Sequence, residues 1–318
     1  MASTDSSKPI RKRPPGALAR AWQSDLGHSF RQSPVAVVAA VLVTVLFLGA
    51  VFAPVIAPYD PFDPATLNLM NGFSAPMEPN QFTGEVFWLG TDDQGRDVFS
   101  AILYGMRISL FVGFAAVLLA MVLGVTLGLI AGYFGGWLDG IIMRAADIQL
   151  TFPSILVAML IFGVARGLTP PDLRDEMAIW VLIVSIGLSD WVQFARVVRG
   201  ATLVERGKEY VQAARLIGRK RTAIMFRHVL PNVLSPVLVI ATIGLALAII
   251  AEATLSFLGV GAPPTQPSLG TLIRIGQSFL FSGEWWILFF PAVTLLVLAL
   301  SVNLLGDWLR EALNPRLR

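Results

Sequence analysis

The sequence predicts an all-α polytopic membrane protein with six transmembrane helices. Of its 318 residues, 55% are hydrophobic and 14% are charged, which is about half the charged share of an ordinary soluble domain. Apolar runs of about twenty residues recur along the chain, and their continuity favours helices over the alternating strands of a lipid-facing barrel. This composition excludes a cytosolic globular enzyme, a disordered tail protein and a collagen-like fibre.

The first predicted span covers residues 34–57, after a tail at 1–33 that carries six basic residues. Its 24 residues would reach about 36 Å as a helix, enough for a hydrocarbon core of ~30 Å. The run is about twice the length of a signal-peptide core and no cleavage pattern follows, so we expect it to be retained. Arg11-Lys12-Arg13 and Trp22 predict that the tail is either an elbow on anionic lipid or a solvated segment.

Five further apolar runs predict the remaining spans. Two of them contain no charged residue, whereas the other three contain Asp139, Arg144 and Asp147, or Asp190 and Arg196, or Glu252. The five predicted spans are 108–130, 138–164, 178–198, 233–258 and 285–305.

The distribution of basic residues predicts the orientation of these spans. With the N-terminus inside, the inner segments hold 18 Lys and Arg residues and the outer segments hold four, as the positive-inside rule requires. Both termini, including the tail 307–318, are therefore expected in the cytoplasm. The segment 58–104, which is rich in proline and has seven acids against one arginine, is expected to be a periplasmic loop.

The inner segment 205–231 is too long for a simple connection. Its pattern predicts a helix at 209–217, a chain reversal at Gly218, and a second helix at 219–230 that Pro231 ends. Ala213 and Ala214 give the first helix a small-residue face. Such a helix can either fit a groove on another protein or lie on anionic lipid, and the residues alone leave both alternatives open.

Charged residues inside predicted spans are candidates for function, because they are costly in lipid. Arg144 and Asp147 stand three positions apart on one helical face, so we expect them to pair. Asp190 is expected either to end its span near Arg196 or to line a solute path. Glu252 is expected either to stabilise a contact between helices or to meet solute at the outer mouth.

Three glycines at Gly124, Gly128 and Gly132 fall on one helical face. Small residues let helices approach closely in lipid, so this face is predicted to be a helix-packing surface. Glycine is common in these spans, and a chance spacing is the alternative.

Several chemistries have no residues to support them. The chain contains no cysteine and two histidines, no Gly-x4-Gly-Lys-Ser/Thr phosphate loop, no His-Glu-x-x-His pair and no Gly-x-Ser-x-Gly elbow. We therefore expect no catalytic residue, metal site or cofactor on this chain. The basic residues follow the membrane topology, so nucleic-acid binding is not expected.

The inner segment resembles the "EAA" loop of binding-protein-dependent ABC importer permeases. The residues that carry this resemblance are Gln212-Ala213-Ala214, Gly218 and Leu230-Pro231. Gln212 and His228 stand where the general pattern has Glu and Ile. Other segments are similar to the C-type permease of dipeptide and oligopeptide importers, and the resemblance covers roughly residues 20–318. These segments are 89–97, 104–110, 132–136, 143–147, 152–153, 255–264 and 303–315.

The resemblance implies a type I ABC importer permease in a bacterial inner membrane, with a transport core at 105–306. It implies a B-type permease partner, two ATP-binding subunits that carry ATP and Mg²⁺, and an external solute-binding protein. Gln212, Ala213, Ala214, Gly218, Leu230 and Pro231 would belong to the loop that couples the permease to the ATPase. The implied solutes are dipeptides or oligopeptides, with glutathione or a nickel chelate as alternatives.

Two other classes of function remain for comparison. A stand-alone secondary transporter predicts inverted repeats, which the two halves do not show, and it gives the long inner loop no role. A membrane-embedded enzyme would need a catalytic group that the sequence does not contain.

Overall fold

The computed structural model describes residues 25–63 and 67–312, and these residues form helices and no strand. The basic motif and Trp22 of the N-terminal tail lie outside the described residues. The α-helices are α2 (Asp25–Gln32), α3 (Pro34–Val51), α4 (Ala53–Ile56), α5 (Val98–Phe134), α6 (Gly136–Leu150), α7 (Ser154–Leu168), α8 (Arg174–Glu205), α9 (Glu209–Leu216), α10 (Arg221–Ile224), α11 (Leu230–Phe257), α12 (Leu269–Gln277) and α13 (Trp286–Ala312). Shorter 3-10 turns are η1 (Leu69–Asn71), η2 (Pro171–Leu173) and η4 (Leu280–Ser282), and η3 (Met225–Val229) is a π-helical turn.

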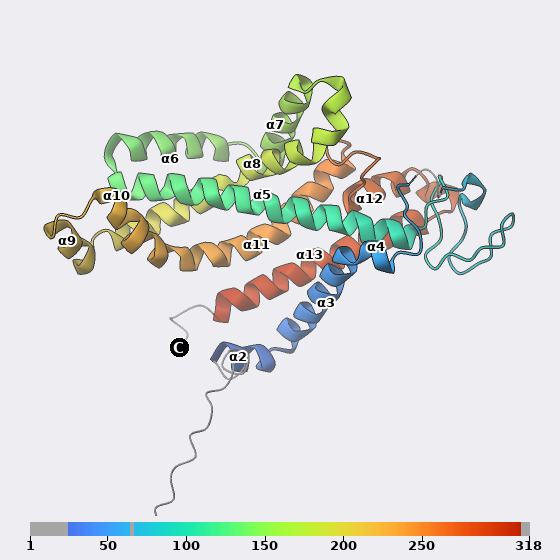
Figure 1. Cartoon of the computed structure of the whole chain (residues 1–318), viewed down its shortest axis with the longest axis horizontal. Coiled ribbons are helices and arrows are strands. Elements are labelled where there is room, and N and C mark those ends of the chain that lie inside the picture. Colours follow the sequence, from blue (N-terminus) through green and yellow to red (C-terminus); the bar gives the residue numbers. More distant parts are fainter. Residues whose placement is uncertain (1–24, 64–66, 313–318) are drawn as a thin grey trace, which may run out of the picture.

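The long helices lie along the long axis of an elongated molecule (Figure 1). Helices α9 and α10 lie at one end, and α12 and the irregular segment before α5 lie at the other. The first residues of α3 and the last residues of α13 both point away from the irregular segment. Phe30 of α2 packs edge-on against Trp308 of α13, with ring centroids 5.0 Å apart, so the two ends of the described chain are neighbours.

Five helices in the described residues are long and apolar enough to cross a membrane, and a bent pair provides a sixth candidate. Helix α5 has 37 residues, about 55 Å at the usual rise, and therefore extends beyond a hydrocarbon core of ~30 Å. Local signals set its ends. Asp97 accepts a hydrogen bond from the Ser100 N–H at the N-cap, and Gly135 takes a positive φ of 67° at the C-cap.

The predicted span 138–164 is not one helix. The chain forms α6 and α7, which meet at an angle of 97° across residues 151–153. Pro153 explains the break, because it cannot donate to the helical ladder and it disfavours a helical conformation at Phe152. The prediction of a continuous helix here was wrong, although the sequence does supply a sixth candidate span.

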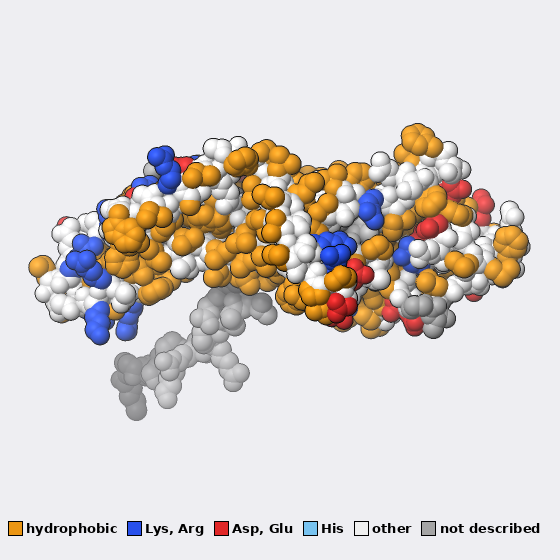
Figure 2. Space-filling view, turned by 90° about the horizontal axis from the view of Figure 1, so that it is seen from above, with side chains coloured by type: hydrophobic (Ala, Val, Ile, Leu, Met, Phe, Trp, Pro, Cys, Tyr) orange, Lys and Arg blue, Asp and Glu red, His pale blue; other side chains and the backbone are white. Residues whose placement is uncertain are grey.

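Side-chain types are distributed along the same axis. Figure 2 shows hydrophobic side chains over much of the visible middle of the molecule and most of the Asp and Glu side chains toward the end away from α9 and α10. Lys and Arg side chains lie at the end that carries α9 and α10, and some lie in the other half of the molecule. The apolar middle is the surface expected for contact with lipid or with another membrane subunit.

The acidic end is an ordered structure. In the segment before α5, Arg96 and Asp92 form an ion pair with an Nε–Oδ2 distance of 2.6 Å, and both side chains are 5% exposed. Trp286, at the start of α13, donates an indole hydrogen bond of 3.0 Å to the Thr91 carbonyl oxygen. These contacts fix the irregular segment on the helical core.

Candidate functional site

The segment between α8 and α11 forms the end of the molecule that bears α9 and α10. Helix α9 is followed by a reversal, then α10, the π-helical turn η3 and α11. Pro231 was expected to end a helix, and this prediction was wrong. It lies in the first turn of α11, and the π-helical turn before it lets Leu230 bond to the Met225 carbonyl oxygen, so the helical path continues through to Phe257.

Gly218 makes the reversal after α9. Its φ is +80°, the left-handed conformation that the sequence predicts for this position. The Gly218 N–H donates to the Arg215 carbonyl oxygen at 3.0 Å, and the Arg219 N–H donates to that of Ala214 at 3.2 Å. This pair of bonds is a Schellman motif, which satisfies carbonyl groups at the end of the helix.

Helix α9 has one face turned into the chain and one face turned outward. Val211 and Ala214 are buried, at 0% and 7% exposure, in a core cluster with Ile224, Met225 and Val229. Ala213 is exposed. The expectation that both alanines face a partner was therefore wrong for Ala214, which packs against its own chain because it shares a face with Val211.

Two large apolar side chains at the end of α9 are exposed, although the sequence pattern of the loop did not single them out. Leu216 and Ile217 are 89% and 81% exposed. A helical projection of 209–217 would have shown that they lie off the face formed by Val211 and Ala214. Together with Ala213 they form an exposed surface, which we call the α9 tip (Ala213, Leu216 and Ile217).

A polar network anchors α9 to the helices on both sides. The Tyr210 hydroxyl donates to Glu205 at the end of α8, and Asn232 of α11 donates to the Tyr210 oxygen at 3.1 Å. Burial, together with the hydrogen bond to Glu205, raises the pKa of Tyr210 to about 12. The hydroxyl therefore keeps its proton at physiological pH and remains a donor to Glu205.

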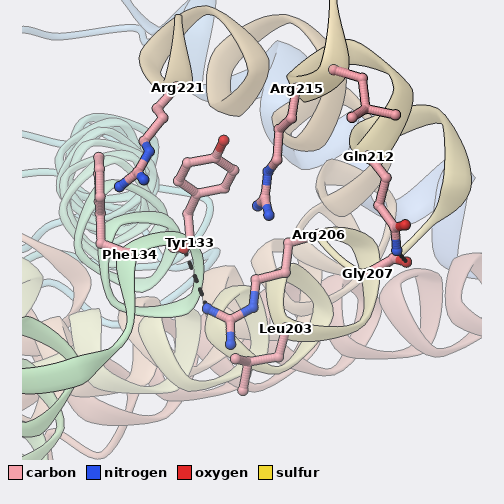
Figure 3. Close-up of a pocket in the computed structure, with 9 residues that line it drawn as sticks. Tyr133, Phe134, Leu203, Arg206, Gly207, Gln212, Arg215 and Arg221 are labelled. Atoms are coloured by element: carbon pink, nitrogen blue, oxygen red, sulfur yellow. Dashed lines mark hydrogen bonds between the residues drawn. The ribbon is translucent and has the colours of Figure 1, made fainter. Parts of the chain in front are cut away.

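A hollow of about 800 Å³ lies beside α9, and three arginines line it (Figure 3). Arg206 donates from Nη1 to the Gly132 carbonyl oxygen at 2.8 Å and to that of Tyr133 at 3.3 Å. Arg215 stacks over the Tyr133 ring, 5.6 Å from its centroid. Arg221 enters from the other side of the ring in this view, so the hollow presents a concentrated positive charge.

Gln212 lies at the rim of this hollow, opposite Tyr133 (Figure 3). Its side-chain amide donates to the Gly207 carbonyl oxygen at 2.9 Å. Gln212 thereby closes the turn between α8 and α9, while Leu230 and Pro231 begin the helix on the other side of the loop.

The three glycines of α5 lie against α8. A Cβ atom added at Gly124 would stand 2.4 Å from the Trp191 carbonyl oxygen, and one added at Gly128 would stand 2.4 Å from that of Ala195. At Gly132 the nearest atom would be the Thr202 Cβ, at 2.7 Å. The two backbones are therefore too close for any side chain at these positions.

The predicted pair between Arg144 and Asp147 does not form. Asp147 binds Arg196 of α8 instead, with an Oδ1–Nη2 distance of 2.5 Å, and Asp139 makes a bidentate pair with Arg199. Arg144 is exposed. The local spacing was misleading because α8 brings arginines of its own alongside α6.

The remaining two charged candidates have different surroundings. Glu252 is fully buried in α11 and accepts a hydrogen bond from Ser256 at 2.7 Å. The hydroxyls of Ser109 in α5 and Ser268 at the N-cap of α12 lie against the same carboxyl group. Glu252 thus lies at a contact between helices. Asp190 is partly exposed and lines a separate cavity between α7, α8 and α11.

Among residues 25–63 and 67–312, no group of three or more His, Asp or Glu side chains could hold a metal ion.

Two family models match the chain. The model described as binding-protein-dependent transport system inner membrane component matches residues 124–318. The model described as the N-terminal TM domain of oligopeptide transport permease C matches residues 18–76.

Curated relatives cover nearly all of the chain. A dipeptide transport system permease protein from Alkalihalophilus pseudofirmus is 38% identical over 91% of this chain and 88% of its own length. An oligopeptide transport system permease protein from Bacillus subtilis is 36% identical, with the same coverage of both chains. A glutathione transport system permease protein from Salmonella paratyphi A is 39% identical over 96% of this chain and 93% of its own length.

The fold is also found in a solved transporter structure. It is an inward-facing conformation of the MetNI methionine ABC transporter, with a TM-score of 0.53 and 20% identity. The match covers 67% of this chain and 96% of the other.

Proposed function

The chain belongs to the family of binding-protein-dependent transport system inner membrane components, and on this premise we propose that it forms half of the translocation pathway of an ATP-driven importer of dipeptides or oligopeptides. It is a multi-pass inner-membrane protein and a non-catalytic subunit. The reaction is alternating access of solute across the membrane, and a partner protein hydrolyses the ATP.

The observation that carries this proposal is the α9 tip. Ala213, Leu216 and Ile217 present an exposed apolar surface at the basic end of the molecule. A surface of this kind is expected at a contact with another protein. The adjoining hollow, with Arg206, Arg215 and Arg221, suits carboxylate side chains of that partner. The occupant we propose is an ATP-binding subunit, which carries the ATP and Mg²⁺.

Anchoring explains how motion of that subunit could reach the membrane. Tyr210 ties α9 to the end of α8 and to α11, and Arg206 ties the same turn to the end of α5. A displacement of α9 would therefore act on three spanning helices together. This rigid attachment is the property that a coupling element requires.

The complete importer, in this proposal, pairs the chain with a B-type permease and with two ATP-binding subunits. An external solute-binding protein delivers the solute to the end formed by α12 and the segment before α5. Both termini and α9 then lie in the cytoplasm, because the positive-inside rule assigns the basic end of the molecule to that side.

Peptides are the proposed solutes because dipeptide and oligopeptide permeases are similar to this chain along nearly its whole length. Glutathione is the second candidate, since a glutathione permease shows comparable identity and coverage.

Uptake by the reconstituted complex tests the proposal. The two permeases, the ATPase subunits and the binding protein are assembled in lipid vesicles, and radiolabelled dipeptide, oligopeptide and glutathione are offered in parallel. We expect ATP-dependent accumulation of a peptide. A complex that accumulates glutathione alone would favour the second candidate, and transport by this chain without ATP would contradict the ABC assignment.

A further inference from the structure

Asp190 is a carboxylate in the middle of a membrane-spanning helix. Helix α8 runs from Arg174 to Glu205, so Asp190 lies about 22–24 Å along the axis from either end. It forms no ion pair with any residue in the described part of the chain, and Arg196, the next basic residue in α8, is bound to Asp147. A charged group at this depth is costly unless it faces the protein interior or a water-filled space.

Asp190 lines such a space. A cavity of about 370 Å³ lies between α7, α8 and α11, within the size range of small-molecule sites. The other polar residues that line the cavity are Ser154, Ser189, Gln193 and Thr254. The rest of the lining is aliphatic, mainly Leu150, Ile155 and Leu247.

Leu150 and Ser154, on either side of the break between α6 and α7, line this cavity, and side-chain bonds hold the end of α6 against α8. The Gln149 amide donates to the carbonyl oxygens of Leu188 and Ser189 at 2.9 and 2.8 Å. Trp191 in turn donates from its indole nitrogen to Gln149 Oε1 at 2.9 Å. These bonds hold the residues on both sides of Asp190 against the end of α6. Broken spans at membrane depth are characteristic of solute-binding regions.

We infer that this cavity is a solute subsite in which Asp190 binds an ammonium group of the peptide, such as its free α-amino group, during passage through the membrane. This inference rests on the proposed function. An ammonium group has three donors and no acceptor, and Asp190, Ser154 and Thr254 all supply acceptor oxygens. The aliphatic walls can contact apolar side chains without requiring one particular sequence, whereas every peptide with a free N-terminus carries the ammonium group.

Transport by the complete reconstituted complex tests the inference. Asp190→Asn removes the charge and keeps the shape, and Asp190→Glu restores the charge. Asp175→Asn is the matched control, because Asp175 is an exposed residue in the first turn of the same helix and lies outside the cavity. We expect Asp190→Asn to lower uptake of a free dipeptide by at least about tenfold, while Asp190→Glu retains most of it and Asp175→Asn retains all of it. Stimulation of ATP hydrolysis by the liganded binding protein reports whether each variant assembles.

A cysteine probe tests the ammonium specificity independently of uptake. The chain has no cysteine of its own, so Thr254→Cys places a single thiol in the cavity. A cationic methanethiosulfonate reagent should modify it faster than an anionic one of similar size. Addition of Asp190→Asn should abolish this preference, and a free dipeptide should protect the thiol better than its N-acetylated form does.

The outcomes separate the two claims. A wild-type complex that does not import any peptide would contradict the proposed function and this inference with it. If the wild type imports peptide and Asp190→Asn imports it equally well, only the inference is overturned. It is also overturned if both Asp190 variants fail to assemble, which would show a structural role, or if the charge preference at Thr254→Cys does not depend on Asp190.

Discussion

Arg206 Nη1 donates a hydrogen bond of 2.8 Å to the carbonyl oxygen of Gly132. The bond joins the turn before α9 to the last turn of α5, 74 residues earlier in the chain. Carbonyl groups at a helix C-terminus have no helical partner and carry partial negative charge, so a guanidinium there is favourable. Through this contact, a displacement of α9 is expected to act on the C-terminal end of α5.

Arg206→Met should weaken that connection. The substitution keeps an apolar stem but removes the donors to Gly132 and Tyr133, a loss of roughly 1–2 kcal/mol. We expect faster backbone hydrogen exchange in α9 and lower stimulation of ATP hydrolysis by the liganded binding protein, with the membrane helices unaffected. Arg219→Met is the control, because Arg219 is exposed and does not line the hollow. Equal exchange in both variants would contradict the role of Arg206.

Gly218→Ala should destabilise the end of α9. Nothing lies within 4 Å of an added Cβ, but φ is +80°, so the cost is that of a left-handed alanine, about 1–2 kcal/mol. Gly200→Ala, within α8, also meets open space but has no positive φ and should be neutral or slightly stabilising. Thermal unfolding of the purified permease pair and hydrogen exchange at α9 would measure both. A Gly218→Ala variant as stable as Gly200→Ala would contradict the conformation assigned to Gly218.

Gly128→Leu should disrupt the packing of α5 on α8. An added Cβ would stand 2.4 Å from the Ala195 carbonyl oxygen, so the two helices would have to separate. We expect this overpacking to lower the free energy of unfolding by about 1–3 kcal/mol or more. We expect poor recovery of folded permease in detergent. Gly140→Leu is the control, since its Cβ would meet open space on α6. Normal recovery of Gly128→Leu would show that α5 and α8 are not in close contact.

Thiol labelling tests the orientation. Phe82, in the irregular segment before α5, is 75% exposed, and Arg219 is exposed after α9. In a chain without native cysteine, Phe82→Cys should react with an impermeant maleimide added outside intact cells. Arg219→Cys should react only after the membrane is permeabilised. Its labelling in permeabilised cells is the positive control, because it shows that the thiol is reactive. Labelling of Arg219→Cys in intact cells would reverse the orientation and end the coupling proposal.

The sequence predicted most of the membrane architecture because apolar runs are a property of single segments. Four of the predicted spans are present as continuous helices, and α5 and α8 extend well past the apolar runs that indicated them. Those extensions contain residues such as Arg199 and Glu205, which hydropathy does not recognise as helical. The break at Pro153 could have been predicted, because the proline is visible within the run.

The details of the candidate site depended on contacts between distant segments. The left-handed turn at Gly218 is local and was predicted. The pairing of Asp147 was not, because Arg196 lies 49 residues away while Arg144 lies on the same helix. The different environments of Ala213 and Ala214 depend on which face of α9 meets η3, a choice that the tertiary packing of Val211 makes.

Ala214→Arg should disrupt the structure of α9, whereas Ala213→Arg should not. Ala214 is 7% exposed within the core cluster, so a buried unpaired charge there should cost several kcal/mol and unfold α9. Ala213 is exposed, so Ala213→Arg should leave the fold intact. Helix content by circular dichroism and hydrogen exchange at α9 distinguish the two variants. Equal destabilisation by both would contradict the observed orientation of α9.

Copurification of the ATP-binding subunits with Ala213→Arg tests the central claim most directly. An arginine on the α9 tip would introduce a long charged side chain into a packed contact, whereas Gln32→Arg, at an exposed residue of α2, adds the same charge far from that surface. We predict that Ala213→Arg folds but loses the ATPase subunits and the binding-protein-stimulated ATP hydrolysis, while Gln32→Arg keeps both. A helix that lies on anionic lipid would instead gain about 1 kcal/mol from the added cation. Wild-type copurification and stimulation in Ala213→Arg would contradict the docking of α9 on the ATPase.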